Sequence, residues 1–275
     1  MSGTSPMLEL EGEATPLRAL LKDLWASRPL LAMLARKEFY VRYRRASFGM
    51  LWAIGLPLIQ AIVLAAVFSR VVRVATPGTN YAVFVFAGVV AWTFFAATLS
   101  ASATAIVDGA GLSTRIYFPR AVLPLVPIGA NLVGLVLSVV ILVAMALISG
   151  EPLGLRLALV VPAIALLLTF TSAISLVLAA LHVYFRDVRY FVQVALLVWF
   201  YVTPVIYPLS LAKDLRGWLT ANPLTGCVEL MRAAVVAAEP ASVAAVLWSL
   251  GWTVALAVAA LALHRRYDRV FVDLL

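Results

Sequence analysis

The chain has 275 residues, of which 64% are hydrophobic and only 12% are charged, and its formal net charge is +8. Soluble globular proteins carry about 25% charged residues, so these few charges could not cover a soluble surface of this size. Cys227 is the single cysteine, which excludes an intramolecular disulfide. These values predict an all-α integral membrane protein with cytosolic and external loops.

The first 49 residues are the longest polar stretch. Thr15-Pro16 is typical of a helix start, with threonine as the N-cap and proline at the first helical position. Leu17, Leu21 and Leu24 then follow at helical spacing and predict an amphipathic helix. Such a helix lies along the membrane surface, packs on the protein's own cytosolic face, or does both.

A basic and aromatic cluster comes directly before the first apolar run, at residues 36–45. In isolation, interleaved basic and aromatic side chains are typical of nucleic-acid binding. Next to a membrane span, the same composition more often marks the lipid headgroup boundary. We therefore expect a membrane boundary here and no nucleic-acid partner.

Six apolar segments follow, and about 20 helical residues are enough to cross the hydrocarbon. We expect spans at residues 50–69, 81–107, 121–149, 157–183, 191–211 and 243–263. The chain then divides into a cytosolic N-terminal region, residues 1–49, and a six-helix transmembrane domain, residues 50–275.

The basic residues indicate the orientation of these spans. With the N-terminus in the cytosol, fifteen Arg and Lys lie on the cytosolic side and six on the other. Because positive charge accumulates on the cytosolic side, this bias predicts that both termini are cytosolic. The host membrane is then the inner or plasma membrane.

The segment between the fifth and sixth spans has a different pattern. Pro204, Pro208 and the charged run 213–216 interrupt the helix, and Asn222-Pro223 is typical of a turn. Residues 224–238 are apolar but contain charged side chains, and they are too few for a seventh crossing. A re-entrant or interfacial helical hairpin on the outer side is expected.

The spans contain no ionisable residue away from their ends, with only His182 near an edge. Ion-coupled transporters carry such residues at mid-membrane, and membrane-embedded enzymes need His or carboxylate clusters. No phosphate-binding G-x-x-x-x-G-K-[ST] loop occurs in the chain. We expect a non-catalytic protein that holds no metal or cofactor and does not hydrolyse ATP by itself.

Two short cytosolic loops, residues 108–120 and 182–190, combine charge with aromatic side chains. This composition is typical of a protein–protein contact, and headgroup anchoring is the alternative. Small residues at Ala97, Ala101 and Ala105 indicate close helix packing within one bundle more than a dimer interface. Trp199, Phe200 and Tyr201 lie deeper in a span and are weak candidates for a sugar-binding platform.

The chain resembles the membrane subunit of type-2 ABC exporters, in particular the polysaccharide group, which exports O-antigen, capsule, teichoic acid and other cell-wall glycans. The resemblance rests on VRYRRASFGMLWAIGLPL (41–58), FAGVVAWTFF (86–95), GLSTRIYFPRAVLPL (111–125), YFRDVRYFVQVALLVWFYVTPVIYPLS (184–210) and NPLTGCVELMR (222–232). These segments occur in the family's order and cover nearly everything from about residue 30 onward.

The resemblance implies a homodimer, with two copies of a separate ABC ATP-binding subunit that carries ATP and Mg²⁺. The N-terminal amphipathic helix would be an interface helix. Contacts to the ATPase subunit would come from Asp108, Gly111, Leu112, Arg115, Tyr117, Phe118, Pro119, Arg120, Phe185, Arg186, Asp187 and Arg189. The translocation path would include Trp52, Phe68, Trp199 and Tyr201. The outer gate would include Pro204, Tyr207, Pro208, Asn222 and Pro223.

The resemblance thus favours a permease subunit that exports a lipid-linked polysaccharide across the cytoplasmic membrane, driven by a partner's ATP hydrolysis. The motif at residues 118–120 and the segment 202–208 favour a glycan over the second candidate, a lipid, drug or other small molecule. A third candidate is an ATP-independent channel or membrane-embedded enzyme, against which the charge-free spans argue.

Overall fold

The computed structural model describes residues 16–44, 48–49, 51–68, 80–113, 118–212, 214–238 and 240–267, and every regular element within these ranges is a helix. The elements are, in chain order, α1 (Leu17–Ala26), α2 (Arg28–Tyr43), α3 (Leu51–Val67), α4 (Tyr81–Ser102), α5 (Ala105–Asp108), α6 (Ala110–Ser113), α7 (Val122–Ile148), η2 (Gly154–Leu159), α8 (Val160–Tyr184), α9 (Val188–Val202), η3 (Leu209–Leu211), α10 (Arg216–Ala221), α11 (Thr225–Val235) and α12 (Val243–Tyr267).

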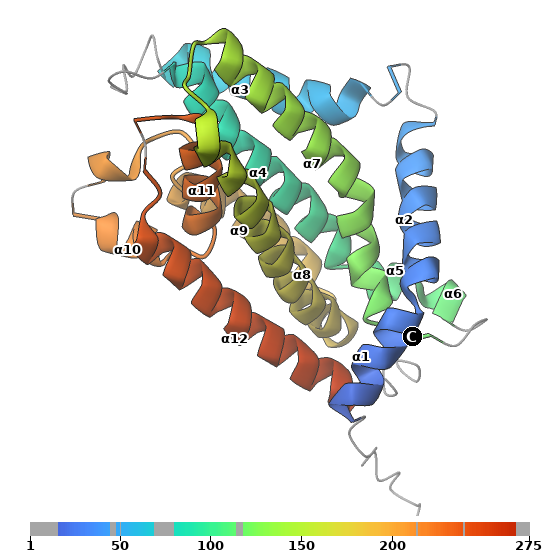
Figure 1. Cartoon of the computed structure of the whole chain (residues 1–275). Coiled ribbons are helices and arrows are strands. Elements are labelled where there is room, and N and C mark those ends of the chain that lie inside the picture. Colours follow the sequence, from blue (N-terminus) through green and yellow to red (C-terminus); the bar gives the residue numbers. More distant parts are fainter. Residues whose placement is uncertain are drawn as a thin grey trace, which may run out of the picture.

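Helix α4 is the centre of the bundle. It packs against α3, α7, α8, α9 and α11 (Figure 1), and sixteen of its residues are buried. Its apolar residues are distributed all round the helix, as expected for a helix that is buried on every side. The main hydrophobic core is therefore built around this one helix.

Four helical segments are long and apolar enough to cross a membrane: Tyr81–Ser102, Val122–Ile148, Gly154–Tyr184 and Val243–Arg265. They confirm four of the six expected spans. Helices α3 and α9, at the other two positions, have 17 and 15 residues. At 1.5 Å per residue these helices are about 26 and 22 Å long, shorter than a hydrocarbon core of about 30 Å. Helix length therefore does not confirm the count of six.

Two helices end earlier than the sequence predicts. The predicted span 81–107 is broken at Ala103 and Thr104, where the Ser102 hydroxyl donates a hydrogen bond to the Pro124 carbonyl at 2.8 Å. The predicted span 191–211 ends at Val202, because Thr203 is extended (φ −90°, ψ 133°). A residue before proline, here Pro204, is biased away from helical conformation.

Helix α1 begins after Pro16, and the predicted N-cap Thr15 lies outside the described residues. The helix packs against α2 and α12. Leu24 is partly buried against a hydrophobic cluster that also contains Phe118, whereas Trp25 is exposed. Of the two placements that the pattern allowed, packing on the protein's own surface is thus observed.

Between α9 and α12 lie the two short helices α10 and α11. All eleven residues of α11 are buried, and the helix packs against α4, α8 and α12. Its Gly226 permits this close approach: a Cβ there would lie 2.7 Å from the Ala245 carbonyl oxygen and 2.8 Å from the Val246 Cα. The Ser249 hydroxyl oxygen would be nearer still, at 2.5 Å. Because the other two atoms belong to the backbone of α12, they cannot give way as the end of a flexible side chain can.

We therefore expect Gly226→Ala to destabilise the protein by about 1–3 kcal/mol, the usual cost of overpacking a filled core. Thermal unfolding of the detergent-purified protein measures the effect as a lower Tm. Gly251→Ala is the matched control, because a Cβ at Gly251 meets no atom within 4 Å. Equal Tm values for the two variants would contradict this account of the α11–α12 contact.

Candidate functional site

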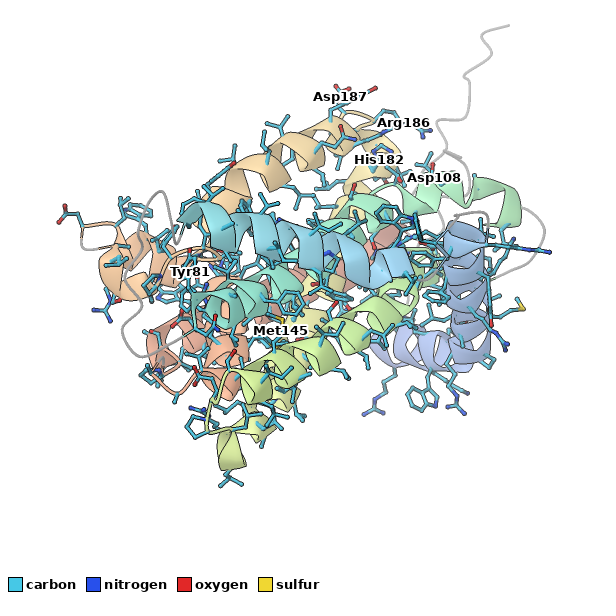
Figure 2. All side chains as sticks on the ribbon, turned by 90° about the horizontal axis from the view of Figure 1, so that it is seen from above. Tyr81, Asp108, Met145, His182, Arg186 and Asp187 are labelled. Carbon is cyan, nitrogen blue, oxygen red and sulfur yellow. The ribbon has the colours of Figure 1, made fainter. Side chains whose placement is uncertain are left out.

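The two loops predicted to contact a partner converge at one end of the bundle. A hydrophobic cluster, here called the loop cluster, joins α5 and the start of α7 to the end of α8. It consists of Ile106, Phe118, Val122, Leu123, Ala179, Ala180 and Val183. Figure 2 shows Asp108, His182, Arg186 and Asp187 at this end of the molecule. Loops that are some 70 residues apart in sequence thus form one surface.

Not all residues predicted for this surface are exposed on it. Phe118 and Arg120 are each only 3% exposed. The Arg120 guanidinium donates a 2.9 Å hydrogen bond to the Phe118 carbonyl, and Phe118 lies in the loop cluster. Phe118, predicted to contact the ATPase subunit, therefore does not lie on the exposed surface, because this side chain fills the chain's own core. Arg115 and Tyr117 lie outside the described residues.

Other predicted contact residues do face outward. Asp108, Gly111, Arg186, Asp187 and Arg189 are exposed, as is Phe185 at 64%. The Thr104 hydroxyl donates to the Asp108 carboxylate at 2.6 Å, which fixes the acidic side chain at the end of α5. Leu112 is partly buried against the loop cluster, and Pro119 is buried. The exposed surface therefore combines both signs of charge with an aromatic ring.

Three of the four residues predicted for the translocation path lie on α3 and α9, and Phe68 directly follows α3. Both helices pack on α4. On α9, Trp199 is half-buried against Phe95 and Phe170, with ring centroids 5.2 and 6.4 Å apart. Tyr201 is 62% exposed. Trp52 of α3 is 38% exposed, and Phe68, the residue after α3, packs against the main core. Of these four side chains, Trp52 lines the cavity described below, and the other three are not among its lining residues.

Asn222, predicted to belong to an outer gate, connects three segments. Its amide nitrogen donates to the Val202 carbonyl at 3.2 Å and to the Thr203 hydroxyl at 3.1 Å. Its amide oxygen accepts from the Trp199 indole at 3.0 Å and from the Leu224 amide at 3.1 Å. This one side chain therefore holds the end of α9 against the turn between α10 and α11.

The other predicted gate residues lie beside this junction. Pro204 and Pro208 are buried, while Tyr207 and Pro223 are half-buried. The Tyr207 hydroxyl donates to the Tyr201 carbonyl at 3.0 Å. The segment after α9 thus folds back along the end of that helix.

A buried arginine fixes the same segment from the other side. Arg232 of α11 is 1% exposed, and its guanidinium carbon lies 3.7 Å from the centre of the Phe84 ring. It donates to the Val205 carbonyl at 2.5 Å and pairs with Glu229 at 3.5 Å. Gly88 of α4 leaves the required space, since a Cβ there would lie 2.8 Å from the Val205 oxygen.

The sequence patterns gave neither Glu229 nor Arg232 a structural role. A signal for their role was nevertheless present, because opposite charges three residues apart on a helix can pair. Charged residues within apolar segments also tend to face the protein interior.

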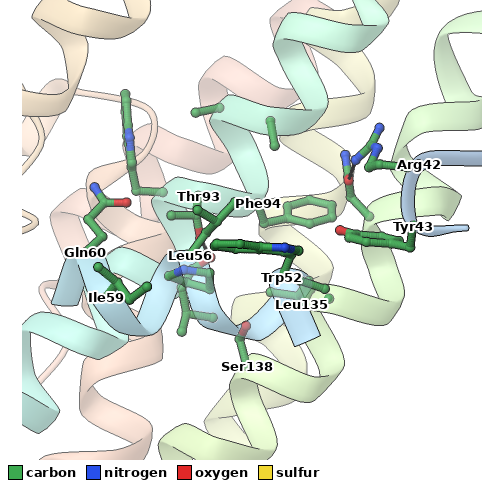
Figure 3. Close-up of a pocket in the computed structure, with 18 residues that line it drawn as sticks. Arg42, Tyr43, Trp52, Leu56, Ile59, Gln60, Thr93, Phe94, Leu135 and Ser138 are labelled. Atoms are coloured by element: carbon green, nitrogen blue, oxygen red, sulfur yellow. Dashed lines mark hydrogen bonds between the residues drawn. The ribbon is translucent and has the colours of Figure 1, made fainter. Parts of the chain in front are cut away.

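A cavity of about 790 Å³ lies between α3, α4, α7 and the end of α2 (Figure 3). Arg42 and Tyr43 lie at one end, and Ile59 and Gln60 lie at the other. Its other lining residues are mostly apolar and include Trp52, Leu56, Val90, Phe94 and Leu135. Helical periodicity alone cannot reveal such a cavity, because its lining comes from several separate helices.

Within the described residues, no group of three or more His, Cys, Asp or Glu side chains is arranged to hold a metal ion. The sites found here are surfaces, packing junctions and an apolar cavity.

An all-helical bundle with four membrane-length apolar helices defines a polytopic membrane protein. The chain belongs to the ABC-2 type transporter family, whose family model matches residues 29–236. It is 34% identical to the O-antigen export system permease protein RfbA of Myxococcus xanthus over 208 residues, or 74% of this chain and 79% of that protein.

Two further relatives are similar over nearly the same length. An O-antigen export system permease protein RfbA of Klebsiella pneumoniae is 30% identical over 72% of this chain and 77% of its own length. The polysialic acid transport protein KpsM of Escherichia coli is 25% identical over 73% of this chain and 78% of its own length.

The Arg232–Glu229 pair yields a stability prediction. Arg232→Met should destabilise the protein by about 3–5 kcal/mol, because it leaves the buried Glu229 carboxylate without this counter-charge. Replacing both residues together, Arg232→Met with Glu229→Gln, should recover part of the loss. Thermal unfolding in detergent provides the measurement, and Arg216→Met on the exposed surface of α10 is the control. A double variant no more stable than Arg232→Met would contradict the pairing.

Proposed function

We propose that the chain is the permease subunit of an ATP-driven exporter that moves a lipid-linked polysaccharide across the cytoplasmic membrane. The observation that carries the proposal is the convergence of the two loops into one exposed, charged and aromatic surface at one end of the bundle. Membership of the ABC-2 type transporter family and similarity to O-antigen export permeases support it.

In this proposal the energy comes from a separate ABC ATP-binding subunit that docks on the loop surface. ATP and Mg²⁺ bind to that subunit, and this chain is non-catalytic and holds no cofactor. Phe185, Arg186, Asp187 and Arg189 provide the exposed contact from one loop, and Asp108 and Gly111 from the other. Phe118 and Arg120 act indirectly, because they hold the loops together from beneath.

The proposed topology has six crossings with both termini in the cytosol. Helices α3 and α9 supply the two crossings that helix length alone does not establish. Both carry exposed apolar faces, which include Ile59 and Ile62 on α3 and Val194 and Leu197 on α9. Lipid tails can cover such faces where water cannot. Residues 1–49 then form the cytosolic region and 50–275 the transmembrane domain.

The complete exporter is proposed to be a homodimer with two ATP-binding subunits. Trp52, Phe68, Trp199 and Tyr201 come from helices that a second copy could complete into one path. Of these, Tyr201 is the most exposed. The junction of α9 with α10 and α11 around Asn222 is the proposed outer gate, with Pro204, Tyr207, Pro208 and Pro223 as its backbone hinges.

The names of the relatives favour a polysaccharide over a drug or another small molecule as substrate. The substrate proposal is tested by deleting the gene in its native host and measuring glycan at the cell surface. Cytosolic accumulation of lipid-linked glycan is expected. Unchanged surface glycan together with loss of a small molecule from the medium would instead favour the second substrate class.

For the coupling surface, we expect Arg186→Glu to reduce co-purification of the P-loop ATPase at least tenfold while membrane insertion stays intact. The reversed charge at residue 186 should repel the groups of the ATPase that bind Arg186. Its neighbour Phe185 is exposed, so this part of the loop is accessible to a partner. Arg216→Glu, an equally exposed reversal on α10, is the control. If both variants retain the ATPase and export normally, the loop surface is not the docking site.

The topology is tested with single cysteines. A membrane-impermeant maleimide should label Leu155→Cys from outside the cell and Arg186→Cys only after permeabilisation. Leu155 is 93% exposed on η2, and Arg186 is exposed in the α8–α9 loop. The native Cys227 is 1% exposed and gives little background. Labelling of both sites in intact cells would refute the proposed orientation.

A further inference from the structure

The cavity between α3, α4 and α7 has two chemically different parts (Figure 3). One end holds the guanidinium of Arg42, the phenol of Tyr43 and the amide of Asn131. The walls are mostly aliphatic and aromatic, with Leu56 and Pro57 from α3, Val90 and Phe94 from α4, and others from α7. A cationic end joined to an apolar chamber fits a ligand that is itself anionic at one end and apolar at the other.

The Arg42 guanidinium is held in place at the cationic end. One of its nitrogens pairs with the Glu38 carboxylate at 2.8 Å, and the other donates to the Asn131 amide oxygen. The Asn131 amide nitrogen in turn donates to the Thr98 hydroxyl of α4 at 3.0 Å. A guanidinium carries five N–H donors, so the two contacts orient Arg42 and leave donors for a further acceptor.

The charge around this end is positive. The last turns of α2 and its C-cap residue, Arg44, span residues 36–44. They carry four basic side chains, Arg36, Lys37, Arg42 and Arg44, against one acidic side chain, Glu38. Burial raises the pKa of the Glu38 carboxyl above its usual value, and Arg42 opposes that shift. Basic clusters beside a membrane span attract anionic headgroups.

The apolar part of the cavity lies among residues of α4 and α7, two of the membrane-length helices. Asn131 is the tenth residue of α7, which places the cationic end about 14 Å along that helix from its first residue. The volume of about 790 Å³ falls within the range of about 300–1,000 Å³ for sites that bind small molecules. Bilayer lipid is the apolar ligand present in greatest amount at this depth.

We propose that this cavity is a binding site for an anionic bilayer phospholipid. One acyl chain occupies the space between α3, α4 and α7, and the phosphate oxygens accept hydrogen bonds from Arg42. A free phosphate ion would leave the apolar walls unmatched, and an uncharged lipid would leave the cationic end unmatched. The bound lipid supports α3 against α4 and α7. This role requires neither the proposed ATPase nor the proposed glycan.

The purified full-length chain tests this directly. It is reconstituted into phosphatidylcholine vesicles in which brominated phosphatidylglycerol or brominated phosphatidylcholine replaces the same mole fraction of lipid. Bromine quenches nearby tryptophans, and Trp52 lines the cavity. Subtracting the signal of Trp52→Phe removes the contribution of the other six tryptophans. We expect brominated phosphatidylglycerol to quench the Trp52 component at a lower mole fraction than brominated phosphatidylcholine does.

Two variants, each with its own control, test the cationic end and the apolar part of the site one at a time. Arg42→Gln should lower the preference for phosphatidylglycerol about fivefold, while Arg44→Gln, exposed and outside the cavity lining, should not. Ala97→Phe places a ring in the cavity and should reduce quenching by both lipids. Val140→Phe, on an exposed face of α7, is its control.

Several outcomes would overturn the proposal. Equal quenching by the two lipids in the unmodified chain would show that the headgroup is not recognised. Equal effects of Arg42→Gln and Arg44→Gln would indicate general surface attraction. Normal quenching in Ala97→Phe would show that no chain enters the cavity. Displacement of phosphatidylglycerol by an equimolar amount of a polyprenyl phosphate would assign the cavity to a carrier lipid instead. The proposed export function would stand or fall separately in each case.

Discussion

The clamp formed by Arg232 is the interaction on which the packing of α11 against α4 and the segment after α9 depends. Its guanidinium lies on the Phe84 ring of α4 and binds the Val205 carbonyl of the segment after α9. An uncompensated buried charge is costly. If α11 separated from α4, Arg232 would therefore need other groups to replace the contacts that it loses. The Tyr81 hydroxyl adds a second bond to the same segment, at 2.5 Å from the Ile206 carbonyl. Two successive carbonyls that helix α9 cannot use are thereby satisfied by α4 and α11.

Arg232 and Asn222 bind successive parts of the backbone at the end of α9. Asn222 binds the last helical carbonyl, that of Val202, together with the Trp199 indole. Arg232 binds the backbone three residues further on. A movement of α9 relative to α10 and α11 must therefore exchange several buried hydrogen bonds at once, so two discrete arrangements are favoured over a continuous series. A gate at this junction would open in a cooperative manner.

Much of the fold could be predicted because membrane helices have a strong signal. The predicted span 121–149 differs from α7 by one residue at each end, and the start of α4 was predicted correctly at Tyr81. Helix ends set by tertiary contacts were missed, as at Ser102, whose hydroxyl bonds the Pro124 carbonyl of the next segment. Phe118 was placed on the surface because its loop is charged, yet long-range packing on α8 buries it. The cavity depends on three helices at once, which no local pattern encodes.

Helices α2, α4 and α7 connect the proposed ATPase-binding loop surface to the cavity. Helix α2 packs against α7 and is joined to α1, which packs against α12. Its Arg42 reaches Asn131 of α7, and Asn131 reaches Thr98 of α4. Five residues beyond Thr98, α4 gives way to the turn that carries α5 and the exposed Asp108. The loop surface is thus connected through α4 to the helix stretch that forms a wall of the cavity. A lipid held there would stiffen this connection, because it fills the space into which α3 and α4 could otherwise move.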